Sequence, residues 1–345
     1  MRYGVGLDPT LGLSFEEHRQ LAREASELGY VDAWTPAGAT SRDAFHTCAQ
    51  WWGATQDKNG GLRTGISVVP VPNFTATQLA AEAGTVSELT GGRFILGIGT
   101  GSIQDPGARR TFNLPEWPAV GMMRDYLVTI RGLLAGETVN HEGKAVTLRG
   151  VKLAFKPPPT PVYVAALGPQ MLRLAGEAAD GVLPNWASPE SIAWCREQVA
   201  AGARKADRDP ASIPIVQYIR VCVDDDADRA RRAFAKAVIP YATARPGQSK
   251  ELGYRGHFAR MGFDEVLSDL EARRDAGAGL DELADRFPVE LMRKVGYFGR
   301  PEGAAAEFKR LAEGLDTALV RVVASRGGVE SARAAMQACR PELLK

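Results

Sequence analysis

Short apolar runs alternate along this chain with longer segments in which apolar residues recur every three or four positions. Residues 13–30 illustrate the second kind, because Leu21 and Ala25 place apolar side chains on one face of a helix. Ser14 and Glu17 have the spacing of a capping box, so we expect this helix to begin directly after Ser14. The apolar runs are bounded by glycine or proline, which is typical of buried strands.

This assignment, repeated along the chain, predicts eight strand–helix units. We expect strands at residues 2–8, 31–36, 63–70, 93–99, 161–167, 180–186, 213–223 and 318–323. We expect helices at residues 13–30, 43–57, 75–88, 117–134, 169–178, from 189 onward, 226–239 and 301–313, and at the carboxyl terminus. The strands are apolar on both faces, as a parallel sheet covered by helices requires. Eight such units favour an α/β fold of the (β/α)8 TIM-barrel type over an open doubly wound sheet.

Two segments interrupt the repeat. Residues 137–159 predict a β-hairpin excursion after the fourth unit, with a turn at Glu142 and Gly143 and a closing run of prolines. Residues 240–295 predict a helical insertion before the eighth strand. No segment rich in glycine, serine or proline separates two domains, so we expect residues 1–345 to form a single barrel domain.

Composition narrows the class of protein. Lysine and arginine total 42 against 41 acidic residues, without long blocks of like charge, so nothing favours a nucleic-acid partner. No run of about 20 apolar residues is present to span a membrane, and no signal-peptide pattern opens the sequence. Cys48, Cys195, Cys222 and Cys339 lie far apart and predict reduced thiols. We therefore expect a cytoplasmic protein that acts on a small molecule, without a nucleic-acid or membrane partner.

The stretch LTGGRFILGIGTGS, residues 89–102, is the most distinctive in the chain. The dinucleotide fingerprint G-x-G-x-x-G fails here, because the sixth position from Gly97 is Ser102 and three strand–helix units come first. The stretch instead predicts the carboxyl end of the fourth barrel strand, where barrels place their chemistry. Glycines there would let a flat ligand approach the backbone, although a glycine-rich turn without a ligand explains the pattern equally well.

Two motifs together resemble one known family. SELTGGRFILGIGTGS, residues 87–102, is similar to the fourth-strand signature of the bacterial luciferase-like barrels. PVYVAALGPQMLRLAGEAADGVLPNW, residues 161–186, is similar to their second signature. Members bind flavin mononucleotide (FMN) or the deazaflavin coenzyme F420, and this chain most resembles the branch of the F420-dependent methylenetetrahydromethanopterin reductases. The resemblance implies hydride transfer between coenzyme F420 and an organic substrate, in a homodimer.

The resemblance also implies where the cofactor binds. Deazaflavin enzymes of the family carry a bulge with a non-proline cis peptide in the third strand, which backs the ring. Counting back from Pro70 places that bond near Ile66–Ser67, so the cofactor-binding set includes Ile66, Ser67 and Val68. A regular strand is the alternative. The glycine loop after the fourth strand adds Gly99, Gly101 and Ser102 to the cofactor-binding set.

A third part of the expected cofactor site is the turn Ala166, Leu167 and Gly168 before the helix at residues 169–178. Backbone N–H groups at a helix start attract phosphate, and the family uses this turn for the cofactor phosphate. Relatives often carry two glycines here, so Leu167 is a departure that puts close approach of the backbone in doubt. A plain strand-to-helix turn is the alternative.

Candidates for the chemistry itself are few. Trp34 ends the second strand and is a candidate wall of the ring pocket. His46 is the one histidine near a predicted strand end at the mouth and is a candidate proton donor, although a lone helical histidine is more often structural. Arg109 and Arg110 follow the glycine loop and are either partners for the acidic tail of coenzyme F420 or solvated surface residues. No histidine pair has metal-ligand spacing, so we expect no metal site.

Three functions remain open at this point. The first is a coenzyme F420-dependent oxidoreductase, and the second is an FMN-dependent monooxygenase that works with a separate reductase. The third is an F420-binding protein without turnover, since no acid–base group is convincing. The resemblance also disfavours a sugar phosphate as the substrate. The glucose-6-phosphate dehydrogenases of the family carry a glutamate after the glycines of the fourth strand, and this chain has Ser102 at that position.

Overall fold

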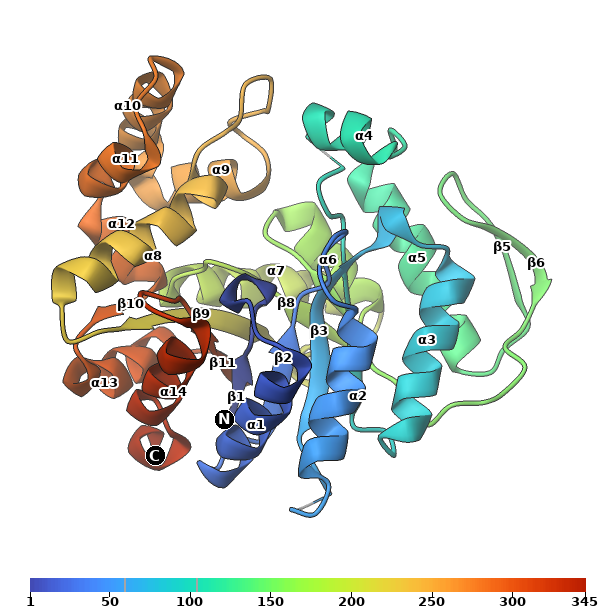
Figure 1. Ribbon diagram of the computed structural model, residues 1–345. Coiled ribbons are helices and arrows are strands. Elements are labelled where there is room, and N and C mark those ends of the chain that lie inside the picture. The colour runs from blue at the N-terminus through green and yellow to red at the C-terminus, as the bar shows by residue number, and fades with distance from the viewer. Residues whose placement is uncertain (59, 104) are drawn as a thin grey trace.

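A ring of eight parallel strands forms the centre of the computed structural model, which describes residues 1–58, 60–103 and 105–345 (Figure 1). The strands of the ring are β1 (Arg2–Gly6), β2 (Asp32–Thr35), β3 (Arg63–Pro70), β4 (Phe94–Gly99), β7 (Val162–Ala165), β8 (Gly181–Leu183), β9 (Val216–Val223) and β11 (Thr317–Val322). Each pairs in parallel with its neighbour, and bridges from Val182 to Ile215 and from Asn185 to Tyr218 join β8 to β9. This closure confirms the predicted barrel, since all eight predicted strands form.

Helices cover the outside of the ring. Those that follow the predicted repeat are α1 (Phe15–Glu27), α2 (Ala44–Thr55), α3 (Ala76–Leu89), α5 (Ala119–Leu134), α6 (Pro169–Ala178), α7 (Pro189–Lys205), α8 (Ala227–Ala242), α13 (Pro301–Leu311) and α14 (Gly328–Ala338). Their starts follow local chemistry, because the Ser14 hydroxyl accepts from the N–H of Glu17 and completes the predicted capping box. Ser188 caps α7 in the same way, with Pro189 in the first turn.

Both predicted interruptions are present. The hairpin consists of β5 (Val139–Glu142) and β6 (Thr147–Val151), which pair in antiparallel register. The insertion contains α9 (Gly253–Phe258), a π-helical turn (Ala259–Phe263), α10 (Asp264–Asp275), α11 (Leu280–Arg286) and α12 (Val289–Val295). It lies at the same end of the barrel as the short helix α4 (Pro106–Phe112), at the top of Figure 1.

Besides short 3-10 turns, two elements of the described residues were not predicted. One is α4, whose seven residues were assigned to the loop before the fourth helix; Asp105 caps it through the N–H groups of Gly107 and Ala108. The other is β10 (Gly296–Gly299), which adds a ninth strand by pairing with the carboxyl-terminal half of β9. β10 closes the insertion and returns the chain to the barrel.

The inside of the ring is filled by side chains rather than open. Trp34, Ile95, Tyr163, Leu183, Val216, Tyr218 and Leu319 form this interior cluster. Because these residues block the barrel, a ligand can enter only at one of its two ends. A separate apolar cluster under α8 and the insertion holds the insertion against the barrel.

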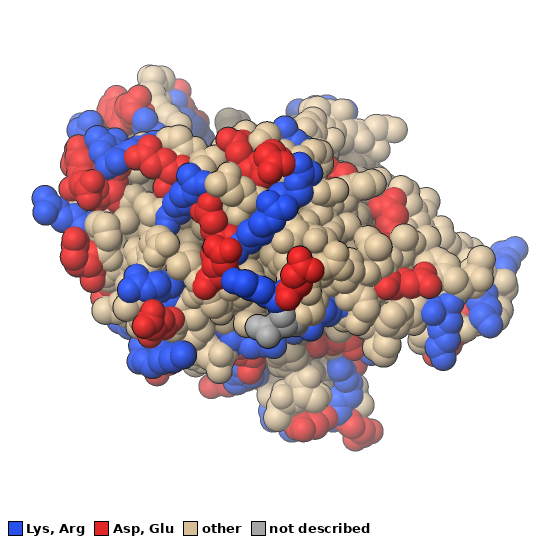
Figure 2. Space-filling view, turned by 60° about the horizontal axis from the view of Figure 1, so that its bottom comes forward, with Lys and Arg blue, Asp and Glu red and all other residues tan. Residues whose placement is uncertain are grey.

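The amino-terminal end of the barrel comes forward in Figure 2, where basic and acidic side chains are interspersed. At the start of the first three strands, Arg2 and Arg63 both form ion pairs with the buried carboxylate of Asp32. Both chain termini lie at this end, and the Tyr3 hydroxyl donates to the carbonyl of Leu344 (Figure 1). None of the helices in the described residues has the length and apolar character needed to cross a membrane.

Candidate active site

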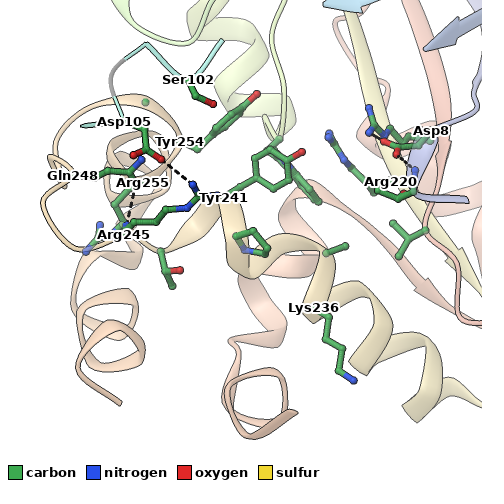
Figure 3. Close-up of a pocket in the computed structure, with 18 of the residues that line it drawn as sticks. Asp8, Ser102, Asp105, Arg220, Lys236, Tyr241, Arg245, Gln248, Tyr254 and Arg255 are labelled. Carbon is green, nitrogen blue, oxygen red and sulfur yellow. Dashed lines mark hydrogen bonds and ion pairs between the residues drawn. The ribbon is translucent and has the colours of Figure 1, made fainter. Parts of the chain in front are cut away.

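A cavity of about 740 Å³ opens at the carboxyl-terminal end of the barrel strands. The segments that line it are the residues after β1 and β4, the ends of β9 and β11, helix α8 and the insertion. Asp8 and Arg220 lie on one side of this cavity, and Asp105 and Arg245 lie on the opposite side (Figure 3). A second cavity, of about 780 Å³, lies at the other end of the barrel near Pro161. Barrel enzymes place their chemistry at the carboxyl ends of the strands, so the first cavity is the candidate active site.

The predicted bulge in β3 is present. The register of β3 against β4 shifts between Ile66 and Val69, and the peptide bond between Ser67 and Val68 is cis. The bond lies one residue beyond the expected Ile66–Ser67 position. The backbone carbonyl of Val68 accepts a hydrogen bond from the N–H of Ala37, which ties the bulge to the loop after β2.

Close packing against the bulge explains why β4 ends in a glycine, Gly99. A Cβ atom at Gly99 would lie 2.5 Å from Cγ2 of Val68, so any larger residue would have to displace the side chain of Val68. Gly101 has a φ of +57°, and a Cβ there would lie 2.7 Å from Cβ of Pro70. Gly101 and Ser102 both line the cavity, so the loop after β4 links the bulge to the candidate site.

The third predicted segment lies beside the fourth strand. β4 and β7 are neighbours in register, with Ile98 opposite Val164, so Gly99 and the turn after Ala165 share one end of the barrel. Gly168 is the N-cap of α6 with extended backbone angles, φ −99° and ψ 157°, and no side chain caps this helix. The first intrahelical hydrogen bond is donated by Leu172. Pro169 has no N–H, and the N–H groups of Gln170 and Met171 have no backbone acceptor among the described residues.

The turn differs from the glycine loop in its relation to the cavity. Ala166 is buried, and the carbonyl of Leu167 accepts a hydrogen bond from Arg260 of the insertion. Neither these two residues nor Gly168 lines the 740 Å³ cavity, although all three lie at the same end of the barrel. The space around Gly168 is open, since nothing lies within 4 Å of a Cβ built there.

The structure does not bring the two predicted catalytic residues into the cavity. Trp34 is fully buried inside the barrel, where its ring packs under Gly65 and near Tyr163, so it supports the site from below. His46 lies on the first turn of α2 with 83% of its side chain exposed, and its Nδ1 lies 2.8 Å from the carboxylate of Asp43. The helical position of His46 was anticipated, but its side chain faces solvent outside the barrel.

The remaining predictions concern two arginines and the cysteines. Arg109 on α4 forms an ion pair with Glu116, which lies in the loop after this helix. Neither Arg109 nor Arg110 is among the residues that line the cavity. The four cysteines are free and buried. Within the described residues, no three His, Cys, Asp or Glu side chains are grouped closely enough to hold a metal ion.

The comparisons with known proteins agree with this architecture. The family model described as "Luciferase-like monooxygenase" matches residues 2–318. The chain belongs to this family. It is 30% identical over 335 residues to 5,10-methylenetetrahydromethanopterin reductase of Methanolobus tindarius, covering 94% of each chain. It is 28% identical to a putative coenzyme F420-dependent oxidoreductase of Mycobacterium tuberculosis, covering 80% of this chain and 82% of that protein.

Two solved structures share the fold of this chain. Coenzyme F420-dependent tetrahydromethanopterin reductase from Methanopyrus kandleri has a TM-score of 0.80 at 20% identity, covering 99% of each chain. EDTA monooxygenase from Chelativorans sp. BNC1 has a TM-score of 0.72 at 16% identity, covering 99% of this chain and 93% of the other. Both pairs of chains share the same fold along nearly their whole length.

A buried ion pair, which sequence reasoning missed, lies where the first and last barrel strands of this luciferase-like chain meet. The carboxylate of Asp8 contacts the guanidinium of Arg321 and accepts a hydrogen bond from the N–H of Thr10. Asp8 and Arg321 both line the cavity, and burial lowers the pKa of Arg321 to about 10, so it stays charged at neutral pH. Asp8 and Asp105 are the two carboxylates of the described lining, and Asp105 is paired with Arg245.

Aromatic rings form a second missed part of the site. Tyr241 lies edge-on to Tyr254 with ring centroids 4.9 Å apart, and Trp186 lies 5.5 Å from Tyr241. The guanidinium of Arg220 lies 3.7 Å from the centre of the Trp186 ring. A signal for Arg220 and Arg321 existed in the sequence, because each is a charged residue in the middle of a largely apolar run, and burying a charge is costly.

Proposed function

We propose that this protein is a coenzyme F420-dependent oxidoreductase that transfers a hydride between the deazaflavin and an organic substrate. The observation that carries the proposal is the likeness over 94% of both chains to a 5,10-methylenetetrahydromethanopterin reductase. The structure with the highest TM-score of the two compared above is likewise that of an F420-dependent reductase. Similarity to these proteins does not specify the substrate. The residues at the carboxyl-terminal end of the barrel show whether the site fits the cofactor.

The residues present fit a flat cofactor with a phosphate. The uncapped first turn of α6 at Gly168 offers backbone N–H donors in open space. The side chain of Val68 in the bulge lies against Gly99. Ile66, Ser67, Val68 and Gly99 do not themselves line the cavity, but they lie next to the loop that does. Gly101 extends the same surface to the cavity. We assign the phosphate to the turn before α6 and the ring to the bulge.

When bound, coenzyme F420 supplies the hydride chemistry, and the protein supplies binding and orientation. The aromatic rings of Trp186 and Tyr241 form a wall on the cavity side where a substrate would lie. Asp8 is the carboxylate positioned to hold or move a proton there, with Arg321 keeping it oriented. Neither His46 nor Trp34 has a part in this assignment.

The test is a pair of calorimetric titrations of the purified protein, one with coenzyme F420 and one with FMN. We expect coenzyme F420 to bind at least tenfold tighter, which corresponds to about 1.4 kcal/mol. FMN binding tenfold tighter would instead support a monooxygenase working with a separate reductase, which the likeness to EDTA monooxygenase favours. Oxygen dependence of turnover separates the same two functions, because reduced deazaflavin does not readily react with oxygen. Tight binding of coenzyme F420 without turnover on any substrate would favour a carrier.

A further inference from the structure

Three arginines are buried among the described residues, and one of them differs from the other two. Arg321 is paired with Asp8, and Arg255 is paired with Glu271. Arg220 is 3% exposed, yet no carboxylate of the described residues forms an ion pair with it. A buried charge without a counter-charge is costly unless something else offsets the loss of hydration.

The partners of the Arg220 guanidinium are all neutral. Its Nη1 donates to the side-chain carbonyl of Asn185 and to the backbone carbonyl of Tyr218, 3.4 Å away. The hydroxyl of Tyr241 is a further neutral neighbour. A guanidinium has five N–H donors, so these acceptors leave donors free. Stacking on Trp186 at 3.7 Å recovers only part of the lost hydration.

Burial lowers the pKa of Arg220, and the groups that oppose this effect are the phenols of Tyr241, Tyr254 and Tyr218 rather than carboxylates. Phenols are neutral at physiological pH, so they do not balance the charge. An arginine side chain is not deprotonated in proteins, so Arg220 carries its positive charge. Arg220 is therefore a fixed positive charge beside an aromatic wall.

The position of Arg220 relates this charge to the cavity. Five cationic side chains belong to the described part of the cavity lining, and four of them have acidic partners: Arg321 with Asp8, Arg245 with Asp105, Lys236 with Asp281, and Arg255 with Glu271. Arg220 is the remaining one, and it lies on the side of the cavity near Asp8 (Figure 3). The positive charge without a counter-charge therefore lies in the wall of the cavity and not in the closed core.

We propose that Arg220 is an anion subsite that binds a carboxylate of the substrate, with the apolar body of the substrate against Trp186 and Tyr241. This proposal rests on the proposed function in one respect, namely that the bound organic acid is the substrate of an oxidoreductase. The planar fork of a guanidinium matches the two oxygens of a carboxylate. Asn185 and the Tyr218 carbonyl hold Nη1, which fixes the plane of the group before the ligand arrives. The substrate class is therefore an organic acid with a flat or apolar body.

Calorimetry with simple acids and their neutral amides tests the subsite directly. The probes are benzoate and hexanoate, with benzamide and hexanamide as matched uncharged controls, added to the protein with and without coenzyme F420. We expect each acid to bind at least tenfold tighter than its amide. Equal affinities, or no binding of either acid, would overturn the proposal, and this comparison needs no substitution.

Arg220→Gln provides the second arm. We expect it to lower the affinity for benzoate at least tenfold and to leave the affinity for benzamide unchanged. Lys236→Gln is the matched control, because it removes the same charge from the same cavity wall, but Lys236 is paired with Asp281 and points away from the rings (Figure 3). We expect less than a twofold change for that control. An equal loss in both variants would mean that only the general field attracts the acid, and the subsite would be refuted.

The cofactor is the other possible source of an anion, and the same variants distinguish it. If Arg220→Gln weakens coenzyme F420 tenfold and leaves benzoate unchanged, the guanidinium holds the cofactor and the proposal fails. A protein that binds benzoate through Arg220 but does not bind coenzyme F420 would keep the subsite and refute the proposed function instead. The two failures are therefore separate observations.

Discussion

A negative charge placed at Gly168 should weaken cofactor binding without unfolding the protein. The structure makes this position suitable, because Gly168 has extended backbone angles that any residue adopts and nothing lies within 4 Å of a Cβ built there. Its φ of −99° lies outside the left-handed region, so a side chain at this position causes no backbone strain. Gly168→Glu therefore tests the phosphate site with little strain.

The magnitude follows from the charges. Two unit charges about 5 Å apart repel by roughly 3 kcal/mol at an effective dielectric constant of about 20. The turn at Gly168 is partly exposed, so solvent and salt reduce this value, and half of it is the expected remainder. A loss of about 1.4 kcal/mol is tenfold in affinity. Folding should change by less than about 1 kcal/mol, since a carboxylate at a helix start is itself favourable.

The assay is a fluorescence or calorimetric titration of coenzyme F420 against wild type, Gly168→Glu and Gly168→Ala, with thermal unfolding of each protein. Gly168→Ala is the control, because it adds a Cβ without charge, and it should bind within about threefold of wild type. Unchanged affinity in a folded Gly168→Glu protein would refute the assignment of the phosphate to the turn before α6. The loop at Gly101 would then be the next place to look.

Further outcomes follow from other contacts. Gly99→Val should destabilise the fold by about 1–3 kcal/mol in urea unfolding, because its Cβ would overlap Val68, whereas an unchanged midpoint would contradict the packing. Asp8→Asn should cost about 3–5 kcal/mol of unfolding free energy by leaving Arg321 without its carboxylate, and adding Arg321→Met should restore part of the loss in a double-mutant cycle. Burial lowers the pKa of His257 to about 4, so its neutral form is favoured in the fold and stability should fall as the pH drops from about 6.5 to 4. Unfolding at stepped pH should show a contribution of about 3 kcal/mol over this window that His257→Gln removes; an unaltered slope would contradict it.

The fold was predictable because its signals are local. Each barrel strand is a short apolar run between glycines or prolines, and caps such as Ser14 and Ser188 mark where helices begin. The two missed elements are short, and β10 depends on pairing with β9, which no local pattern expresses. The helix α4 did have a local signal, an Asp105 cap followed by proline, inside a stretch assigned to a loop.

The site was only partly predictable, because its residues come from distant parts of the chain. The glycine loop at Gly101 and the turn at Gly168 are local motifs, and both lie at the predicted end of the barrel. The pair of Asp8 and Arg321 joins residues from the two ends of the sequence, so spacing could not reveal it. His46 shows the opposite error, since its place on a helix near the mouth was expected but the direction of its side chain was not.

Competition between the two candidate cofactors tests the central claim most directly. The protein is dialysed against an equimolar mixture of coenzyme F420 and FMN, and the bound molecules are released by denaturation and quantified by chromatography. Our account predicts that coenzyme F420 is recovered at a ratio of at least about ten to one, the ratio that corresponds to about 1.4 kcal/mol. Equal recovery, or an excess of FMN, would contradict the claim that this luciferase-like protein is an F420-dependent oxidoreductase.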